Sequence, residues 1–199
     1  MSHILFGIDY GSKLSGNTVI AVLNENKIYF LDVDKGADAD EFIFQAAQHF
    51  KPEIIFLDAP LSLPGRYTGK GPVVDYHFRQ ADRELNAMSP MFLGGLTARA
   101  IQLKDRLESS ISTKVYETYP KAIAHNYQLK DYGNKKRKSN LIACRTNIIA
   151  KLNPRLLIDC QEIKTWHHLD ALLALYGAMR FVMGQGLTYG HEEEGLIHV

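Results

Sequence analysis

The stretch ILFGIDYGS, residues 4–12, decides the fold class. Its apolar residues run almost without interruption from Ile4 and stop at the carboxylate of Asp9, and the glycine that follows is typical of a turn. A short apolar run bounded in this way is typical of a strand that is buried on both faces of a sheet. The stretch therefore predicts a central strand that ends on an aspartate.

Four further strands are expected around this one. Residues 18–23 and 27–33 are strand-like and are joined by short turns, so the first three strands should pair antiparallel. An amphipathic helix that ends at Pro52 leads to a fourth strand at 53–58, and a fifth follows at 114–119. A helix between two strands indicates a crossover, so the fourth and fifth strands should lie parallel to the first.

The remaining segments predict helices on both sides of this mixed five-stranded sheet. A loop rich in proline and glycine at 60–72 and a helix at 74–88 would form a helical insertion after the fourth strand. Other patterns predict helices at 97–108, after Pro120, at 135–151 and at 166–183, and a short edge strand at 195–197. No repeat or linker divides the chain, so we expect one α/β domain over residues 1–199.

The composition limits the class of protein. The 199 residues are 46% apolar, which suits one core of ordinary size. Lys and Arg number 23 and Asp and Glu number 22, and this net charge of +1 excludes a polycation or an acidic disordered chain. No apolar run approaches the roughly 20 residues of a membrane span, and the start lacks a basic signal-peptide region. We therefore expect a cytoplasmic protein without a membrane partner, with Cys144 and Cys160 as reduced, small apolar residues.

Four acidic residues lie in apolar surroundings and are candidate catalytic groups. Asp9 and Asp58 end the first and fourth strands, Glu117 lies in the fifth strand, and Asp170 lies in an apolar helix. An unpaired buried charge costs several kcal/mol, and the carboxyl ends of parallel strands meet at the edge where α/β sheets bind ligands. Converging carboxylates repel one another unless a cation joins them, and hard oxygen ligands favour Mg²⁺ or Mn²⁺.

Each of these acids also has an ordinary explanation when it is taken alone. A carboxylate at the end of a strand commonly caps a helix or accepts hydrogen bonds in a loop, which applies to Asp58. Asp170 could be a surface residue that the helix dipole favours near an N-terminus. The occurrence of all four together favours the metal-site interpretation.

The motifs around these acids resemble those of a known family. Residues 6–12, followed by Gly16-Asn17-Thr18, resemble the opening of ribonuclease H-like proteins. More narrowly, the chain is similar to the domain-of-unknown-function family four-two-nine, whose members are described as predicted ribonuclease H-like nucleases. The segments that carry this resemblance cover nearly the whole chain in the family's order: LDAPLSLP at 57–64, RQADREL at 79–85, LTAR at 96–99, YETYP at 116–120 and HLDA at 168–171.

This resemblance implies a ribonuclease H-like fold and two-metal hydrolysis of phosphodiester bonds. Carried over to this sequence, Asp9, Asp58 and Asp170 match the metal-binding acids, and Glu117 matches the acid of the fifth strand. The two ions of such a site lie about 3.5–4 Å apart and stabilise the attacking and leaving oxygens.

Basic residues supply candidates for contacts with substrate. The family pattern implies that Arg79 and Arg83 line the cleft and contact phosphate, although the same residues also suit a solvated helix face. Residues 130–145 hold six basic residues and one acidic residue, a net charge of +5 that suits a nucleic-acid backbone and also suits a solvated loop. From this segment we take Lys136 and Arg137, together with Ser12 in the turn after the first strand, as substrate-binding candidates.

His167 and His168 lie close to Asp170 in sequence, but no third nitrogen or sulfur ligand at zinc spacing accompanies them. We expect one of the two histidines to orient a water or a ligand and the other to be structural.

Three functions remain open from the sequence. The first is a metal-dependent nuclease that acts on DNA or RNA. The second is an ATP-binding or phosphotransfer protein of the actin and sugar-kinase type, which also opens with a strand, an acid and a Gly-Ser/Thr turn but normally has a second domain. The third is a catalytically silent nucleic-acid-binding protein. The oligomeric state is also open, and a homodimer is one of the alternatives.

Overall fold

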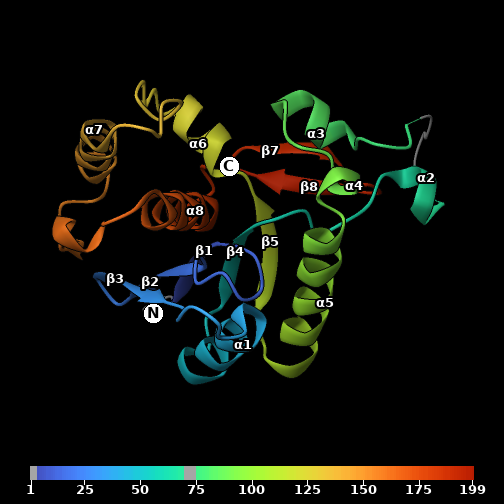
Figure 1. Ribbon diagram of the computed structural model, residues 1–199, viewed down its shortest axis with the longest axis horizontal. Helices are drawn as coiled ribbons and strands as arrows, with labels where there is room; N and C mark the ends of the chain where they lie inside the picture. Colours follow the sequence, from blue (N-terminus) through green and yellow to red (C-terminus); the bar gives the residue numbers. More distant parts are fainter. Residues whose placement is uncertain (1–3, 70–74) are drawn as a thin grey trace.

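The computed structural model describes residues 4–69 and 75–199. These residues form one eight-stranded sheet with helices on both faces (Figure 1), and the strand order is β6-β3-β2-β1-β4-β5-β8-β7. The strands are β1 (Leu5–Asp9), β2 (Val19–Asn24), β3 (Lys27–Asp32), β4 (Ile54–Asp58), β5 (Lys114–Thr118), β6 (Leu157–Ile158), β7 (Thr188–His191) and β8 (Gly195–His198).

The predicted arrangement of the first five strands is confirmed. β1 pairs antiparallel with β2 and parallel with β4, β2 pairs antiparallel with β3, and β4 pairs parallel with β5. The fold is thus a mixed α/β fold in which β1 is central. Its last residue, Asp9, lies directly opposite Asp58, the last residue of β4.

The predicted strand number of five is wrong, because β6, β7 and β8 extend the sheet on both sides. β6 has only two residues, which is too short to give a sequence pattern. The segment 195–197, predicted as an edge strand, does form β8, but β7 pairs with β8 and is itself the edge. β7 has the sequence TYGH, whose glycine and polar residues do not alternate as a half-buried strand normally does.

The helices divide between the two faces of the sheet. Figure 1 shows α1 and α5 on one face and α6, α7 and α8 on the other. The helices are α1 (Ala39–Phe50), α2 (Gly65–Thr68), α3 (Gln80–Leu85), α4 (Pro90–Leu93), α5 (Gly95–Ser110), α6 (Pro120–Asn126), α7 (Lys138–Ile149) and α8 (Trp166–Val182), with a 3₁₀ turn at Cys160–Glu162. None of the helices in the described parts of the chain is long and apolar enough to span a membrane.

Side chains on β1 alternate between two hydrophobic cores. Phe6 and Ile8 pack with residues of α1 and α5, whereas Leu5 packs with residues of α8. The period of two in a strand therefore directs Gly7 and Asp9 toward α8 as well. A Cβ on Gly7 would lie 2.0 Å from the backbone nitrogen of Leu175, so the glycine lets α8 lie directly against β1.

Two predicted helices begin later in the structure than in the prediction. For the helix predicted at 74–88, Val74 lies outside the described residues, and Asp75 accepts hydrogen bonds from the backbone of His77 and Phe78 in a turn. Only α3, from Gln80 to Leu85, is helical there. For the helix predicted at 135–151, a turn precedes α7, which begins at Lys138, and this turn frees three basic residues from the helix.

Candidate metal and active site

Asp9 and Asp58 form the base of the candidate site. They end the parallel strands β1 and β4 and are paired in register. Ile55 and Leu57 of β4 pack in the core under α1 and α5, so alternation turns Asp58 to the opposite face, the one that α8 covers. Asp9 faces the same side, and the two carboxylates therefore lie next to each other.

Asp170 reaches the same place from α8. Thr165 caps this helix by accepting a hydrogen bond from the backbone of His168, which fixes where the helix begins. Because Gly7 allows α8 to lie against β1, the first turns of the helix come close to the end of that strand. The side chain of Asp170 is only 10% exposed and that of Asp9 is 13% exposed.

Lys135 and Tyr132 hold the carboxylate of Asp170. The Lys135 Nζ atom lies 2.6 Å from Oδ2, and the Tyr132 hydroxyl donates to Oδ1 at 2.6 Å. Both residues come from the connection between α6 and α7. Lys135 was counted in the basic segment of the sequence, but no spacing pattern pointed to its contact with Asp170, 35 residues away. Tyr132 carried no signal either, and both residues were missed.

The two histidines of α8 have different surroundings. His167 Nδ1 donates to Asp9 Oδ2 at 2.7 Å, and its side chain is 44% exposed. His168 is buried, with Nδ1 at 2.7 Å from the Thr165 hydroxyl and Nε2 at 3.1 Å from Asp32 Oδ1. His167 is therefore the histidine that contacts the candidate site, and His168 joins α8 to β3.

The pKa values show that the carboxylates act on one another. Burial, followed by the negative charges of Asp9 and Asp170, raises the pKa of Asp58 well above its usual value. Burial also raises the pKa of Asp170, and the positive charge of Lys135 opposes this rise. The hydrogen bond to Asp9 raises the pKa of His167. Each raised carboxyl pKa favours the protonated form of its group, because burial and the neighbouring negative charges disfavour a further negative charge at this place.

The donor chemistry of the three aspartates suits a hard divalent cation. All of their side-chain donors are carboxylate oxygens, the ligands that Mg²⁺ and Mn²⁺ prefer. Among the described residues, however, no three His, Cys, Asp or Glu side chains are arranged as a preformed metal centre. Lys135 and His167 instead hold one oxygen each of Asp170 and Asp9. The three aspartates therefore have the ligand chemistry that such an ion prefers. In this structure, Lys135 and His167 contact two of them instead.

Glu117 is held by Arg79, next to the cavity that Asp58 lines. It pairs in register with Leu57 and follows Val115 by two residues, so it faces the core under α1 and α5. Its carboxylate is buried and accepts two hydrogen bonds of 2.6 Å from the guanidinium of Arg79, as well as one of 2.8 Å from the backbone N–H of Leu61. The parity of its position in β5 points its side chain to the face opposite that of Asp58, but both residues line the same cavity of about 220 Å³ and the charge of Glu117 contributes to the raised pKa of Asp58. Its role as a fourth acid of the site stays a prediction.

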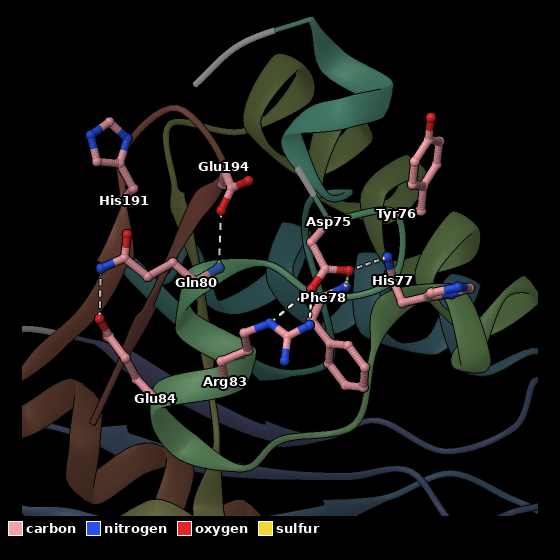
Figure 2. Close-up of a pocket in the computed structure, with 9 residues that line it drawn as sticks. All are labelled: Asp75, Tyr76, His77, Phe78, Gln80, Arg83, Glu84, His191 and Glu194. Carbon is pink, nitrogen blue, oxygen red and sulfur yellow. Dashed lines mark hydrogen bonds and ion pairs between the residues drawn. The ribbon is translucent and has the colours of Figure 1, made fainter. Parts of the chain in front are cut away.

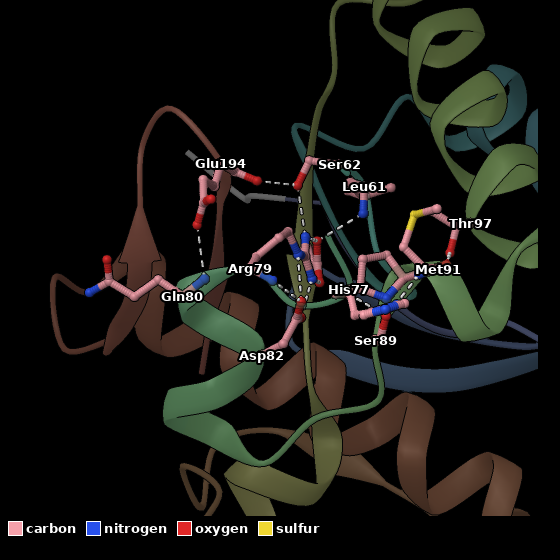
Figure 3. Close-up of polar contacts among 12 residues, drawn as sticks. Leu61, Ser62, His77, Arg79, Gln80, Asp82, Ser89, Met91, Thr97 and Glu194 are labelled. Atoms are coloured by element: carbon pink, nitrogen blue, oxygen red, sulfur yellow. Dashed lines mark hydrogen bonds and ion pairs between the residues drawn. The ribbon is translucent and has the colours of Figure 1, made fainter. Parts of the chain in front are cut away.

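Arg79 is buried and held by side chains of the protein on every side that the structure describes. Its side chain is fully buried, and it binds Asp82 and the Ser62 hydroxyl as well as Glu117 (Figure 3). Burial opposes a charged guanidinium, but the hydrogen bonds with Glu117 and Asp82 raise the pKa of Arg79 above its ordinary value. Its side chain has no exposed surface, and its predicted contact with phosphate stays a prediction.

The network around Arg79 joins the insertion to the C-terminal hairpin. The Ser62 hydroxyl donates to the backbone oxygen of Glu194, and the carboxylate of Glu194 accepts from the backbone N–H groups of Gly65 and Gln80 (Figure 3). These contacts fix the segment that follows Asp58 and place α3 alongside β7 and β8 (Figure 1).

Arg83 lies away from the aspartates. It is exposed, forms an ion pair with Asp75 and stacks on the ring of Phe78 at 4.9 Å. It lines a cleft of about 710 Å³ together with residues of the 75–78 segment, of α3 and of the β7–β8 hairpin, and Figure 2 shows these side chains. A second cavity, of about 220 Å³, is the one that Asp58 lines, and the side chain of Arg83 does not reach it.

The other candidate substrate contacts are exposed. Ser12 lies in the connection after β1, where its backbone oxygen accepts from Ser15 at 3.2 Å. Lys136 and Arg137 lie in the turn before α7, directly after Lys135. The structure therefore brings together Asp9, Asp58 and Asp170 and leaves Ser12, Lys136 and Arg137 exposed. Glu117 and Arg79 line the same cavity as Asp58, whereas Arg83 lies in a separate cleft. Cys144 is buried, which raises its pKa to about 11, so its thiol is protonated and unsuited to a nucleophile's role.

Eight chains among the solved structures match this one, and two of them are of the same protein. "Thermus thermophilus RuvC structure" and "T. thermophilus RuvC in complex with Holliday junction substrate" each have 15% sequence identity to this chain and a TM-score of 0.43, and the match covers 94% of this chain and 98% of the other. The assignment of a mixed α/β fold rests on the strand order and not on this likeness. A comparison with curated proteins finds no significant match.

One family model matches the sequence, over residues 93–194. This range includes Asp170, Lys135 and His167, and it makes up just over half of the 199 residues. The family is described as "Protein of unknown function (DUF429)", the family that the motifs resemble. The chain belongs to this family.

Proposed function

We propose that this protein is a metal-dependent nuclease with a ribonuclease H-like fold that hydrolyses phosphodiester bonds of DNA or RNA. One observation carries the proposal: Asp9 and Asp58 face each other at the ends of two parallel strands, and Asp170 joins them from α8. Three carboxylates in partly buried positions repel one another, and a divalent cation relieves that repulsion.

Asp9, Asp58 and Asp170 would hold Mg²⁺ or Mn²⁺. When bound, such ions supply an activated water and neutralise the charge of the phosphate that is attacked. His167 would orient Asp9, since its Nδ1 donates to one oxygen of that carboxylate and leaves the other free for the ion. The resemblance to the family supports a two-ion site, with Asp9 as the shared ligand.

Exposed residues near the aspartates would bind the nucleic acid. Lys136 and Arg137 lie on the turn that also carries Lys135, so phosphates bound there would be held close to Asp170. Ser12 would contribute a hydroxyl from the turn after Asp9. Arg79 is left out because it is buried, and Arg83 because Asp75 already neutralises it in a separate cleft.

The test is hydrolysis of labelled single-stranded DNA, double-stranded DNA and RNA in the presence of Mg²⁺ or Mn²⁺. The wild-type protein should cleave at least one of these, and Asp9→Asn should lower the rate by more than about a hundredfold, because metal catalysis contributes several kcal/mol. Asp105→Asn removes an exposed carboxylate of α5 and should cleave like the wild type. Equal cleavage by Asp9→Asn and the wild type would contradict the assignment. A folded wild type that binds nucleic acid without cutting it would favour the silent binding protein.

A further inference from the structure

The ammonium group of Lys135 lies at the candidate site, in contact with Asp170 and Tyr132. Its Nζ atom lies 2.6 Å from Asp170 Oδ2 and 3.2 Å from the Tyr132 hydroxyl oxygen. The same ammonium lies 4.5 Å from the centre of the Tyr132 ring and 5.6 Å from that of the Trp166 ring, within the range of a cation–π contact. One carboxylate, one hydroxyl and two aromatic rings therefore surround this single positive charge.

This contact differs from an ordinary surface ion pair. Asp170 is buried, and Tyr132 is buried beside it, so the carboxylate has lost most of its contact with water. The side chain of Lys135 remains 42% exposed, and the residue lies in a turn outside any helix or strand. The ammonium can therefore leave without unfolding an element, whereas Asp170 cannot remain there without a cation or a proton.

The charges at the site match this arrangement. Asp9, Asp58 and Asp170 together carry three negative charges when ionised, and Lys135 neutralises one of them. The remaining two negative charges equal the charge of one divalent ion. The two oxygens of Asp170 are both already engaged, by Tyr132 and Lys135, while the side chain of Asp58 forms no hydrogen bond within the described residues.

We infer that Lys135 holds one of the two cation positions of this site in the free protein, so that the free protein binds one fewer divalent ion than its carboxylates would otherwise bind. This inference rests on the proposed function, since it assumes that the aspartates bind divalent ions. Lys135 is a positioning residue that competes with an ion. Binding of the second ion then requires that the ammonium leave Asp170.

The experiment counts Mn²⁺ ions per chain, without nucleic acid, by electron paramagnetic resonance of free Mn²⁺ during a titration. The variant Lys135→Gln removes the charge, and Lys135→Met removes it while keeping an unbranched stem against Tyr132 and Trp166. Lys135→Arg keeps the charge. Lys130→Gln is the matched control, because Lys130 is exposed in the same connection and forms no ion pair among the described residues. Circular dichroism confirms that each variant is folded.

We expect Lys135→Gln and Lys135→Met each to bind one more Mn²⁺ per chain than the wild type, and Lys135→Arg and Lys130→Gln to bind the wild-type number. An equal number in the wild type and in the two neutral variants overturns the inference. If that equal number is one or more, the metal site of the proposed function stands; if no variant binds Mn²⁺ at all, the proposed function fails as well. Should Lys135→Gln not fold, Lys135→Met decides alone.

Discussion

Arg79 carries a positive charge in a position with no exposed surface. Such a charge is tolerated because Glu117 and Asp82 each bind the guanidinium through short hydrogen bonds, and a Ser62 hydroxyl completes the set. An arginine suits this position better than a lysine would, since its planar fork binds two carboxylates at once.

Replacement of Arg79 tests this structural role. Arg79→Met should lower the free energy of unfolding by about 3–5 kcal/mol, because it leaves two buried carboxylates without their partner. The control is Arg83→Met, four residues further along the chain. Loss of its exposed ion pair should change the free energy of unfolding by less than about 1 kcal/mol. Urea denaturation measures both. Similar values for the two variants would refute the buried role of Arg79.

The residues of the candidate site differ in how far the sequence revealed them. Asp9, Asp58 and Asp170 are visible because a charge at the end of an apolar run is expensive unless it has a function. Glu117 has the same appearance, yet nothing in the sequence states which face of β5 it occupies. Lys135 and Tyr132 are 35 and 38 residues from Asp170, and only the path of the α6–α7 connection brings them to it.

At the scale of elements, the contact between β1 and α8 assembles the site. Gly7 has no side chain, and α8 lies where a side chain would otherwise stand. If that separation grew, Asp170 and His167 would move away from Asp9 together, because all of the helix moves as one body.

A methyl group at Gly7 should therefore disrupt both the packing and the site. The Cβ in Gly7→Ala would lie 2.0 Å from the Leu175 backbone nitrogen and 2.5 Å from the Ala171 oxygen. We expect a loss of stability of about 3 kcal/mol or more, measured by denaturation. Gly95→Ala is the control, since nothing lies within 4 Å of its added Cβ, and it should be neutral or slightly stabilising. Equal stabilities for these two variants would mean that α8 does not lie against β1 as described.

The hairpin of β7 and β8 should make stability depend on pH through His198. This histidine is buried among Phe56, Tyr116 and Phe181, and burial lowers its pKa. The unfolded chain then binds a proton near pH 6.5 that the folded chain does not, so the stability from this residue is present above that pH and is lost as the pH falls.

The variant His198→Phe removes this titration. Relative to the wild type, the variant should become more stable as the pH is lowered from 7.5 to 5. Urea denaturation at each pH measures this difference. The lost hydrogen bond with Thr188 adds only a constant offset. A stability difference that stays the same at both pH values would show that His198 is not held neutral by burial.

Element boundaries were predicted well where local signals are strong. α8 covers Trp166–Val182 against a predicted 166–183, because its cap and its apolar face both lie in the sequence. The insertion was predicted poorly. Arg79 has an extended backbone and is the N-cap residue of α3, and the side chain of Asp82 accepts a hydrogen bond from its backbone N–H. The helix therefore begins at Gln80, although the composition of the preceding residues suits a helix.

At the scale of the whole molecule, the order of the central strands follows from connection lengths. Short turns require antiparallel neighbours and helical crossovers require parallel ones, and both rules hold for β1 to β5. The edges of the sheet follow no such local rule. β6 and the β7–β8 hairpin are held by contacts between distant segments, such as that of Glu194 with Gln80, and the sequence does not reveal those contacts.

The near-zero net charge likewise describes the molecule and not its parts. The segment 130–145 carries +5, so the rest of the chain carries −4. The structure places the basic segment next to the acidic cluster, since Lys135 of that segment binds Asp170. The attraction between these parts, rather than the total charge, bears on what the protein binds.

The central claim is that Asp9, Asp58 and Asp170 form a site for divalent cations. The most direct measurement is a crystal structure of the protein soaked in Mn²⁺, with anomalous scattering used to locate the ions. The account predicts an anomalous peak within about 2.5 Å of carboxylate oxygens of both Asp9 and Asp58. The absence of a peak there, in a crystal that binds Mn²⁺ elsewhere, would contradict it.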